Sequence, residues 1–154
     1  ETGADWQGDE KHCNRQVRQH FGADADHLTY YDEGNLFAPI ASGSAAADAM
    51  VVVPCSMGSV ARIAAGISGT LLERAADVML KEQRPLILVP RETPLSQIHL
   101  ENLLRLSRAG ARIVPAMPAF YHHPSSMDEL VNFMVGKILD QLGIEQLLFP
   151  PWQG

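Results

Sequence analysis

The stretch VVVPCSMGSVARI, residues 51–63, changes character abruptly in its middle. Three valines lead into Pro54 and Cys55, and polar Ser56 separates this apolar run from a segment rich in small residues. A continuous, rather than alternating, apolar run is typical of a strand covered on both faces, as in a parallel sheet. The stretch therefore predicts a buried strand that turns directly into a helix, and it raises the question of what the turn does.

The same alternation of strand and helix continues along the chain. Apolar runs at residues 86–90 and 111–115 predict two further strands, and HLTYY at residues 27–31 predicts a short one. Helices are predicted around these strands, over residues 9–21, 59–68, 70–83, 96–110 and 126–142. Strands that alternate with helices indicate an α/β fold with a parallel sheet, here of few strands.

Three of the predicted helices carry end signals in the sequence. Thr70 with Glu73 and Ser126 with Glu129 have the spacing of a capping box, in which two residues cap a helix start reciprocally. Gly110 is expected to follow the end of the helix over 96–110, because glycine readily takes the left-handed conformation found after helices.

Composition excludes several classes of function. A chain of 154 residues suits one domain, and 46% of its residues are hydrophobic. The net charge of −6 and the lack of a Lys/Arg run argue against a nucleic-acid partner. No apolar run approaches the roughly 20 residues that span a membrane. With Cys13 and Cys55 as the only cysteines, no disulfide framework or CxxC zinc site is available, so a reduced, cytoplasmic protein is predicted.

Three turns are the candidate site. In a parallel α/β sheet, ligands bind beyond the carboxyl ends of the strands. The segments 54–56, 90–94 and 115–118 take that position here, and each contains prolines or polar groups. The second of them contains Arg91 and Glu92.

The turn from Ser56 to Ser59 allows two interpretations. Its hydroxyls, Gly58 and the free N–H groups of a helix start suit an anion such as a flavin phosphate, but an ordinary helix cap would use the same residues. Cys55 could be a thiolate activated by the helix start. Because no His or Lys is placed in the sequence to activate it, a buried structural cysteine is favoured.

Charged side chains on two predicted helices are further candidates. Arg74 and Lys81 are seven residues apart, so they share one helix face and could clamp a phosphate together. A solvated helix face explains the same spacing. Lys137 lies within the last predicted helix and is, from its position alone, most simply a surface residue.

The loop PAFYHHPSS, residues 118–126, places Tyr121, His122 and His123 between prolines. Adjacent histidines suggest a metal, but the HExxH spacing is missing and no nearby carboxylate completes a site. No metal is predicted.

Four blocks of the sequence closely resemble the UbiX-type flavin prenyltransferases. They are ASGS at 41–44, PCSMGSV at 54–60, ERAADVMLKEQRPLILVPRETPLSQIHLENLLRLSRAGA at 73–111 and PAFYHHP at 118–124. The match is dense from Ala41 onward and loose before it. The resemblance implies a flavodoxin-like or Rossmann-like fold, in which a doubly wound parallel sheet forms three layers and binds FMN.

The resemblance also implies an activity and partners. Members of the family join a dimethylallyl group from dimethylallyl phosphate to N5 and C6 of reduced FMN, without a metal. They assemble as homo-dodecamers with sites at subunit interfaces, and their product serves UbiD-type decarboxylases, one of them in ubiquinone synthesis. No side-chain nucleophile is needed, which fits an inert Cys55.

The same resemblance assigns roles to three groups of residues. The flavin would be held by residues of two strand-end turns: Ser56, Met57, Gly58, Ser59 and Arg91. The dimethylallyl phosphate would be bound by Tyr121 and Lys137, with Arg74 and Lys81 acting on its phosphate. The carboxylates that move protons would be Glu92 and Glu1.

The chain departs from the family at its beginning. Family members start with a strand that leads into a Gly-Ala-Ser-Gly turn for the flavin phosphate, and this βαβ unit is not present before Glu1. We therefore expect residues 1–154 to be a single flavin-binding prenyltransferase domain that is N-terminally incomplete, and the native gene product to be longer.

Three other functions compete with this one. A flavin-dependent cysteine decarboxylase of the phosphopantothenoylcysteine type uses a PxMNxxMW motif, but the matching segment PAMPAFYHHP lacks both Asn and Trp. A non-catalytic flavin-binding or assembly subunit would tolerate the missing glycine-rich turn. A thiol-dependent hydrolase would rest on Cys55 alone.

Overall fold

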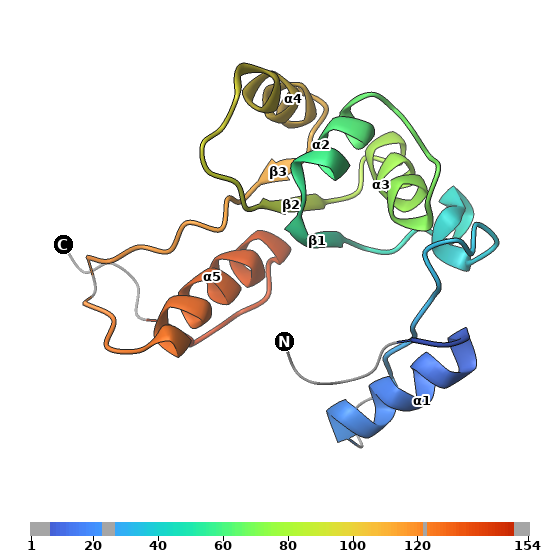
Figure 1. Ribbon diagram of the computed structural model, residues 1–154, viewed down its shortest axis with the longest axis horizontal. Helices are drawn as coiled ribbons and strands as arrows, with labels where there is room; N and C mark the ends of the chain where they lie inside the picture. Colours follow the sequence, from blue (N-terminus) through green and yellow to red (C-terminus); the bar gives the residue numbers. More distant parts are fainter. Residues whose placement is uncertain (1–6, 23–26, 122, 150–154) are drawn as a thin grey trace.

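A three-stranded parallel sheet in the order β1-β2-β3 forms the centre of the protein (Figure 1). The structure, a computed structural model, describes residues 7–22, 27–121 and 123–149. The strands are β1 (Met50–Cys55), β2 (Leu86–Pro90) and β3 (Arg112–Ile113). β1 pairs with β2 from Met50 opposite Leu86 to Cys55 opposite Pro90, and its register shifts between Val52 and Cys55.

Helices fill the connections between the strands. They are α1 (Glu10–Phe21), α2 (Met57–Ala64), α3 (Leu71–Lys81), α4 (Gln97–Arg108) and α5 (Met127–Leu142), with short 3-10 helices η2 (Pro39–Ala41) and η3 (Gly43–Ala45). In Figure 1, α2, α3 and α4 lie on one side of the sheet and α5 lies on the other. This gives the three layers expected from the sequence.

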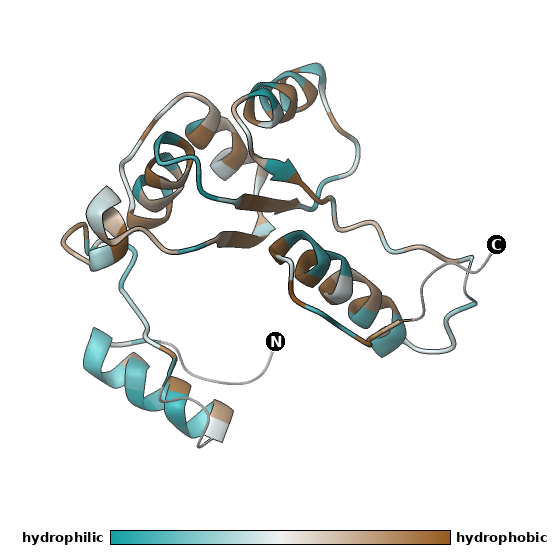
Figure 2. Ribbon diagram, turned by 180° about the vertical axis from the view of Figure 1, so that it is seen from behind, coloured by the Kyte–Doolittle hydropathy of each residue, from teal (hydrophilic) through white to brown (hydrophobic). Residues whose placement is uncertain are grey.

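The core lies between the sheet and helices α2, α3 and α4. All five residues of β2 are buried, and Leu86 and Leu88 pack in one cluster with side chains from the three helices, among them Val60, Met79 and Leu106. Figure 2 shows β2 as a continuously hydrophobic strand. The continuous apolar run therefore identified the central strand correctly. Burial of each aliphatic side chain stabilises the fold by about 1.5–3 kcal/mol, so a strand covered on both faces favours an apolar residue at every position.

The predicted strand over 27–31 is wrong, and α1 provides the reason. The backbone N–H of Tyr30 donates to Asn14 Oδ1 at 2.8 Å, and its carbonyl accepts from Asn14 Nδ2 at 2.9 Å. The N–H of Asp32 donates to Glu10 Oε1. Side chains of the polar helix α1 thus satisfy backbone groups that a strand would pair with another strand.

Helix ends follow the sequence signals with one change. The reciprocal capping box of Thr70 and Glu73 is confirmed. At α5, Ser126 Oγ accepts from the N–H of Glu129 as predicted, but the Glu129 carboxylate binds the N–H and hydroxyl of Ser125 instead of returning to Ser126. Gly110, at φ 102°, follows the cap residue of α4.

Among the described residues, no helix combines the length and the apolar character that a membrane crossing requires.

Candidate functional site

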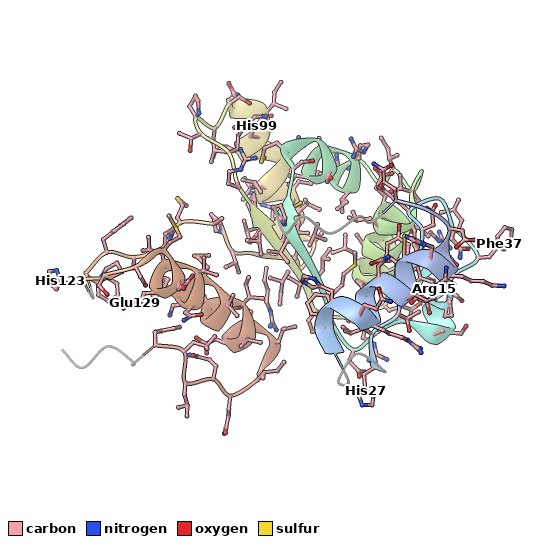
Figure 3. All side chains as sticks on the ribbon, turned by 60° about the horizontal axis from the view of Figure 1, so that its bottom comes forward. Arg15, His27, Phe37, His99, His123 and Glu129 are labelled. Atoms are coloured by element: carbon pink, nitrogen blue, oxygen red, sulfur yellow. The ribbon has the colours of Figure 1, made fainter. Side chains whose placement is uncertain are left out.

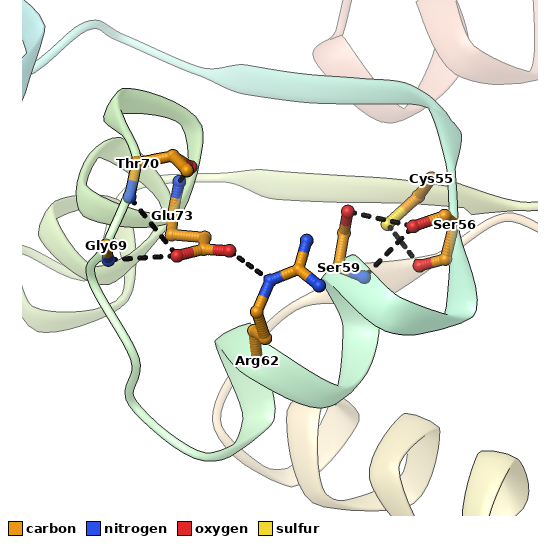
Figure 4. A network of polar contacts seen from close by, with 7 residues as sticks. All are labelled: Cys55, Ser56, Ser59, Arg62, Gly69, Thr70 and Glu73. Atoms are coloured by element: carbon orange, nitrogen blue, oxygen red, sulfur yellow. Dashed lines mark hydrogen bonds and ion pairs between the residues drawn. The ribbon is translucent and has the colours of Figure 1, made fainter. Parts of the chain in front are cut away.

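Ser56 joins the carboxyl end of β1 to the first residue of α2. Ser56 caps the helix, because its Oγ accepts from the N–H of Ser59 at 3.0 Å, and the two hydroxyl oxygens also lie 3.0 Å apart (Figure 4). A Cβ added at Gly58 would meet Arg62 Nη1 at 3.3 Å and Ser56 Oγ at 3.6 Å. The turn therefore offers two hydroxyls and a backbone that a ligand can approach closely.

Two neighbours of this turn have structural roles. The Met57 side chain is 7% exposed and belongs to the core, so Met57 could contact a ligand only through its backbone. Cys55 is 1% exposed, and burial raises the pKa of its thiol to about 11. A protonated, buried thiol is a poor nucleophile, which argues against a thiol-dependent reaction and supports the structural interpretation of Cys55.

A buried carboxylate ties α2 to the start of α3. Glu73 accepts hydrogen bonds from Arg62 Nε and from the backbone N–H groups of Gly69 and Thr70 (Figure 4). The bond from Arg62 is the main cause that lowers the pKa of the Glu73 carboxyl, against the opposing effect of burial. The bond holds Arg62 at Nε, and Nη1 of the same guanidinium lies beside Gly58.

The second strand-end turn lies close to the third. A cavity of about 80 Å³ separates them, and its lining includes Arg91, Glu92, Leu95 and Met117. The N–H of Ala116 donates to the carbonyl of Pro90 at 2.9 Å, which holds the two turns together. Glu92 Oε1 accepts from the N–H of Thr93 at 3.0 Å. Arg91 and Glu92 are both exposed, so their charged groups are accessible to a ligand.

Arg74 and Lys81 share a face of α3, as their spacing predicted, and both reach the same turn of η2 and η3. Arg74 Nε donates to the carbonyl of Ala41 at 3.1 Å. Lys81 Nζ lies 3.0 Å from Glu82 Oε1 and 3.0 Å from the position a Cβ would take at Gly43. Two cations therefore gather beside the segment ASGS, each next to a carboxylate: Lys81 next to Glu82, whose Oε1 is the atom nearest to an added Cβ at Gly43, and Arg74 next to Asp77.

The serines of that segment have no role predicted from the sequence. The hydroxyl oxygens of Ser42 and Ser44 lie 3.0 Å apart, in the turn that Arg74 and Lys81 approach. Hydroxyls beside two cations are a donor set suited to a phosphate. The sequence signal that could have identified these serines is the run A-S-G-S, which resembles the family. Nothing in the sequence, however, indicates that this run lies against α3, which begins about 30 residues later.

Tyr121 and Lys137 come together around the ring of Phe133. The rings of Tyr121 and Phe133 meet edge to face with centroids 6.4 Å apart. Lys137 Nζ lies 5.5 Å from the Phe133 centroid and 5.0 Å from that of Phe149, positions at which a cation is attracted to an aromatic face. The predicted pair is thus joined by an aromatic cluster, and Lys137 is not an isolated surface residue.

Within one chain, the cations of α3 remain apart from the other candidate groups, whereas Lys137 lines a cavity with Pro115 and Met117 of the third strand-end turn. Lys81 ends α3 before the amino end of β2, whereas Arg91 follows the carboxyl end of β2, about 15 Å along the strand. Tyr121 and Lys137 lie with α5, on the other side of the sheet from α3 (Figure 1). Glu1 lies outside the described residues. In the described part of the chain, no cluster of three or more His, Cys, Asp or Glu side chains could hold a metal ion.

Comparison with known proteins gives one consistent result. The family model described as Flavoprotein matches residues 12–139. A flavin prenyltransferase UbiX from Alkalihalophilus pseudofirmus is 55% identical over 136 residues, which is 88% of this chain and 68% of the relative. The flavin prenyltransferase UbiX from Pseudomonas aeruginosa is 52% identical over 136 residues, 88% of this chain and 65% of the relative. The chain thus spans about two-thirds of the length of these curated relatives.

Solved structures agree with the sequence relatives. The crystal structure of AnUbiX in complex with FMN and dimethylallyl pyrophosphate superposes with a TM-score of 0.81 at 47% identity, covering 82% of this chain and 68% of that one. The dodecameric FMN-dependent UbiX-like decarboxylase from Escherichia coli O157:H7 gives a TM-score of 0.81 at 45% identity, with 92% and 80% covered. These structures confirm the flavodoxin-like α/β fold. The chain therefore belongs to the flavoprotein family, and within that family to the UbiX-type flavin prenyltransferases.

Proposed function

We infer that the protein, in its native length, joins the dimethylallyl group of dimethylallyl phosphate to N5 and C6 of reduced FMN. The observation that carries this proposal is the 47% identity and TM-score of 0.81 with AnUbiX, which was crystallised with FMN and dimethylallyl pyrophosphate. The cysteine decarboxylase alternative has no comparable support, because this chain lacks the Asn and Trp of that motif.

The flavin would lie against the turns at the ends of β1 and β2. Ser56 and Ser59 supply hydroxyls, the first turn of α2 supplies backbone N–H groups, and Gly58 lets the ligand approach. Met57 would act through its backbone, since its side chain is in the core. Arg91, exposed in the adjoining turn, would supply positive charge. Bound there, reduced FMN is the electron-rich acceptor of the prenyl group.

The phosphate of the donor would be held by the cations of α3. When the allylic C–O bond breaks, the electron pair leaves with the phosphate, whose growing negative charge Arg74 and Lys81 would stabilise. The hydroxyls of Ser42 and Ser44, in the turn beside these cations, add hydrogen-bond donors. Fixed cations and hydroxyls accelerate the cleavage because they stabilise the leaving group more than the intact ester.

The aromatic cluster of α5 would bind the prenyl end and the far side of the phosphate. Tyr121 is 55% exposed and offers a hydroxyl, and Lys137 offers an ammonium held over two rings. Aromatic faces also stabilise a developing allyl cation. Glu92, exposed in the turn beside Arg91, would take up a proton from the flavin and return one, with Glu1 as the second candidate.

The separation of these groups in one chain supports a site completed between copies of the protein. The α3 cations would meet the α5 cluster and the strand-end turns only when chains associate. The stripe of Met127, Val131 and Val135 on α5 is exposed by 72%, 51% and 39%, and a second copy would bury it. We therefore extend the dodecameric assembly of the Escherichia coli relative to this protein.

The product would pass to a UbiD-type decarboxylase, and the reaction would take place in the cytoplasm. Both cysteines are buried and neither forms a disulfide, which suits a reducing compartment.

A direct assay tests the transferase. The native-length protein is incubated with reduced FMN and dimethylallyl phosphate without oxygen, and the flavin is analysed by mass spectrometry. We expect FMN enlarged by one five-carbon unit. No adduct with this donor or with other prenyl phosphates would exclude the proposal, and decarboxylation of a cysteinyl substrate would establish the first alternative.

Two variants connect the activity to the site. Arg91→Ala should abolish adduct formation together with FMN binding, whereas Cys55→Ala should retain both, because a buried thiol takes no part. Loss of activity in Cys55→Ala with FMN binding intact would instead indicate a thiol mechanism. Native-length protein that binds FMN yet gives no adduct would favour the non-catalytic subunit.

A further inference from the structure

Arg62 of α2 uses only one edge of its guanidinium in the fold. Its Nε donates to the Glu73 carboxylate. Within the described part of the chain, neither of its terminal nitrogens forms a hydrogen bond. A guanidinium bonded only at Nε keeps its two terminal nitrogens as a planar fork, the geometry that binds phosphate and other oxygen acceptors bidentately.

Glu73 fixes the orientation of this guanidinium. The Glu73 side chain is 2% exposed, against 48% for Arg62. Its Oε2 accepts from the N–H groups of Gly69 at 2.9 Å and Thr70 at 3.2 Å, and its Oε1 accepts from Arg62. An exposed arginine such as Arg15 on α1 (Figure 3) gives up the freedom of a long side chain when it binds a ligand, whereas Arg62 is already held.

The open edge of Arg62 reaches the turn at the end of β1. A Cβ added at Gly58 would lie 3.3 Å from Arg62 Nη1 and 3.6 Å from Ser56 Oγ, so both donors approach one point. Because glycine has no Cβ, that point is open to a ligand. Ser59 Oγ lies 3.0 Å from Ser56 Oγ, and Figure 4 shows the guanidinium between the Glu73 carboxylate and these serines. One guanidinium and two hydroxyls are a donor set suited to a ligand oxygen.

A structural tie between α2 and α3 explains the bond at Nε but gives no use to the terminal nitrogens. Because Glu73 balances the charge of Arg62, these nitrogens add directed donors to the turn rather than net positive charge. Directed donors fix the position of an oxygen, whereas net charge attracts an anion from a distance. Arg91, exposed in the adjoining turn, would supply that charge.

We propose that Arg62 is a further flavin-binding residue: Glu73 positions its guanidinium, and the terminal nitrogens donate, together with the Ser56 hydroxyl, to an oxygen of the flavin. This oxygen belongs to the phosphate of FMN or to a carbonyl of its ring, since both accept from such donors. The inference rests on the flavin-binding part of the proposed function and is independent of prenyl transfer.

Flavin titration of the native-length protein tests the contact without a prenyl donor. The double variant Arg62→Gln with Glu73→Gln removes the guanidinium and leaves no buried carboxylate unpaired. Its Kd for FMN should rise about tenfold or more, the effect of losing hydrogen bonds from a charged group. Glu73→Gln alone keeps the guanidinium and an oxygen that accepts from Nε, so its Kd should stay close to that of the native protein. Equal losses in the two variants would show that Arg62 is only a tie and would overturn the proposal.

The ion pair of Arg84 and Asp48 offers a matched control. It joins the segments just before β1 and β2, at the end of the strands away from the turns. Arg84→Gln with Asp48→Asn removes this pair without changing the net charge, and the Kd for FMN should not change. A rise as large as that of the first double variant would assign the effect to general loosening and overturn the proposal.

Arg62→Lys keeps the test decisive if the double variant does not fold, as judged by circular dichroism. Lysine keeps a cation beside Glu73 but has no pair of terminal nitrogens, so FMN binding should still weaken. Native affinity in Arg62→Lys would show that the fork is not used and would overturn the proposal.

Riboflavin, which lacks the phosphate, identifies the oxygen. If losing Arg62 weakens binding of FMN but not of riboflavin, the contact is to the phosphate; if both weaken alike, it is to a ring carbonyl. Both results support the proposal. Native protein that binds FMN but forms no prenylated FMN would refute the proposed function and leave this inference intact. Prenylated FMN formed by a double variant of native FMN affinity would do the reverse.

Discussion

Replacing Gly58 by alanine should make the chain more stable and, at the same time, a poorer flavin binder. Gly58 is in the first turn of α2, and it is not among the glycines with positive φ. Alanine can therefore adopt its backbone conformation. An added Cβ would meet only two atoms, Arg62 Nη1 at 3.3 Å and Ser56 Oγ at 3.6 Å. The fold does not require glycine here, so a requirement for glycine would come from a ligand.

The two effects have opposite signs and measurable sizes. A glycine replaced by alanine at a compatible position stabilises a protein by about 0.4–1 kcal/mol, because the unfolded chain loses freedom. The Arg62 guanidinium must shift slightly, which reduces this stabilisation to about 0.5 kcal/mol. For a chain of this size, that corresponds to a rise of about 1–2 °C in Tm. A methyl group forced against a packed ligand costs about 1–3 kcal/mol. That corresponds to about 5- to 150-fold weaker FMN binding.

Urea unfolding followed by circular dichroism measures the first effect, and flavin titration of the native-length protein measures the second. Gly66→Ala is the matched control. Gly66 has φ +72°, so alanine there is strained and should lower the stability by about 1 kcal/mol. Its surroundings are open, with nothing within 4 Å of an added Cβ, and flavin affinity should not change.

Two results would refute this reasoning. If Gly58→Ala lowers stability by more than about 1 kcal/mol, the glycine is needed by the fold and Arg62 cannot yield. If FMN affinity stays unchanged, the flavin does not approach the backbone of this turn, and the role assigned to Gly58 is wrong.

Three further predictions concern other parts of the molecule. Cys55 in the folded chain should react with iodoacetamide far more slowly at neutral pH than in the urea-unfolded chain, since burial raises its pKa; equal rates would contradict its burial. Folding lowers the pKa of the Glu73 carboxyl below 4.5, so its contribution to stability is fully present above pH 4.5 and is lost as the pH falls through the folded-state pKa. Glu73→Gln should therefore be less stable at pH 7, and its stability should depend less on pH in the acid range. If the pH dependence of stability is the same in Glu73→Gln, another group causes it. Gly136→Ala should displace the Phe149 ring, which a Cβ would contact, and thereby lose the NMR contacts between that ring and Lys137; retained contacts would show that the helix moves instead.

Local sequence signals predicted the elements whose stability is local. The apolar run over 86–90 could be recognised because a strand buried on both faces needs no alternation. The box of Thr70 and Glu73 could be recognised because a cap needs only neighbours three residues apart. The start of α4 at Ser96 was also predicted, but the bond from Ser96 to His99 was not, because His99 is not a usual capping residue and only its ring orientation shows this bond.

The predicted strand over 27–31 failed for the opposite reason. Its composition favours a strand, but Asn14 of α1 satisfies the backbone of Tyr30. The hydrogen-bond partner of a backbone group depends on how segments far apart in the sequence pack together. The composition of residues 27–31 does not indicate that packing.

The sequence by itself determined the parallel α/β fold and, through family resemblance, the residues to examine. Only the tertiary structure showed that Arg74 and Lys81 lie against the turn that contains Ser42 and Ser44. It also showed that the Phe133 ring contacts both Tyr121 and Lys137. Finally, it showed that the cations of α3 stay apart from Lys137 and Arg91 in one chain. The physical reason is that a strand or helix is specified by neighbouring residues, whereas a binding site depends on where the folded chain, and further copies of it, carry side chains from distant segments.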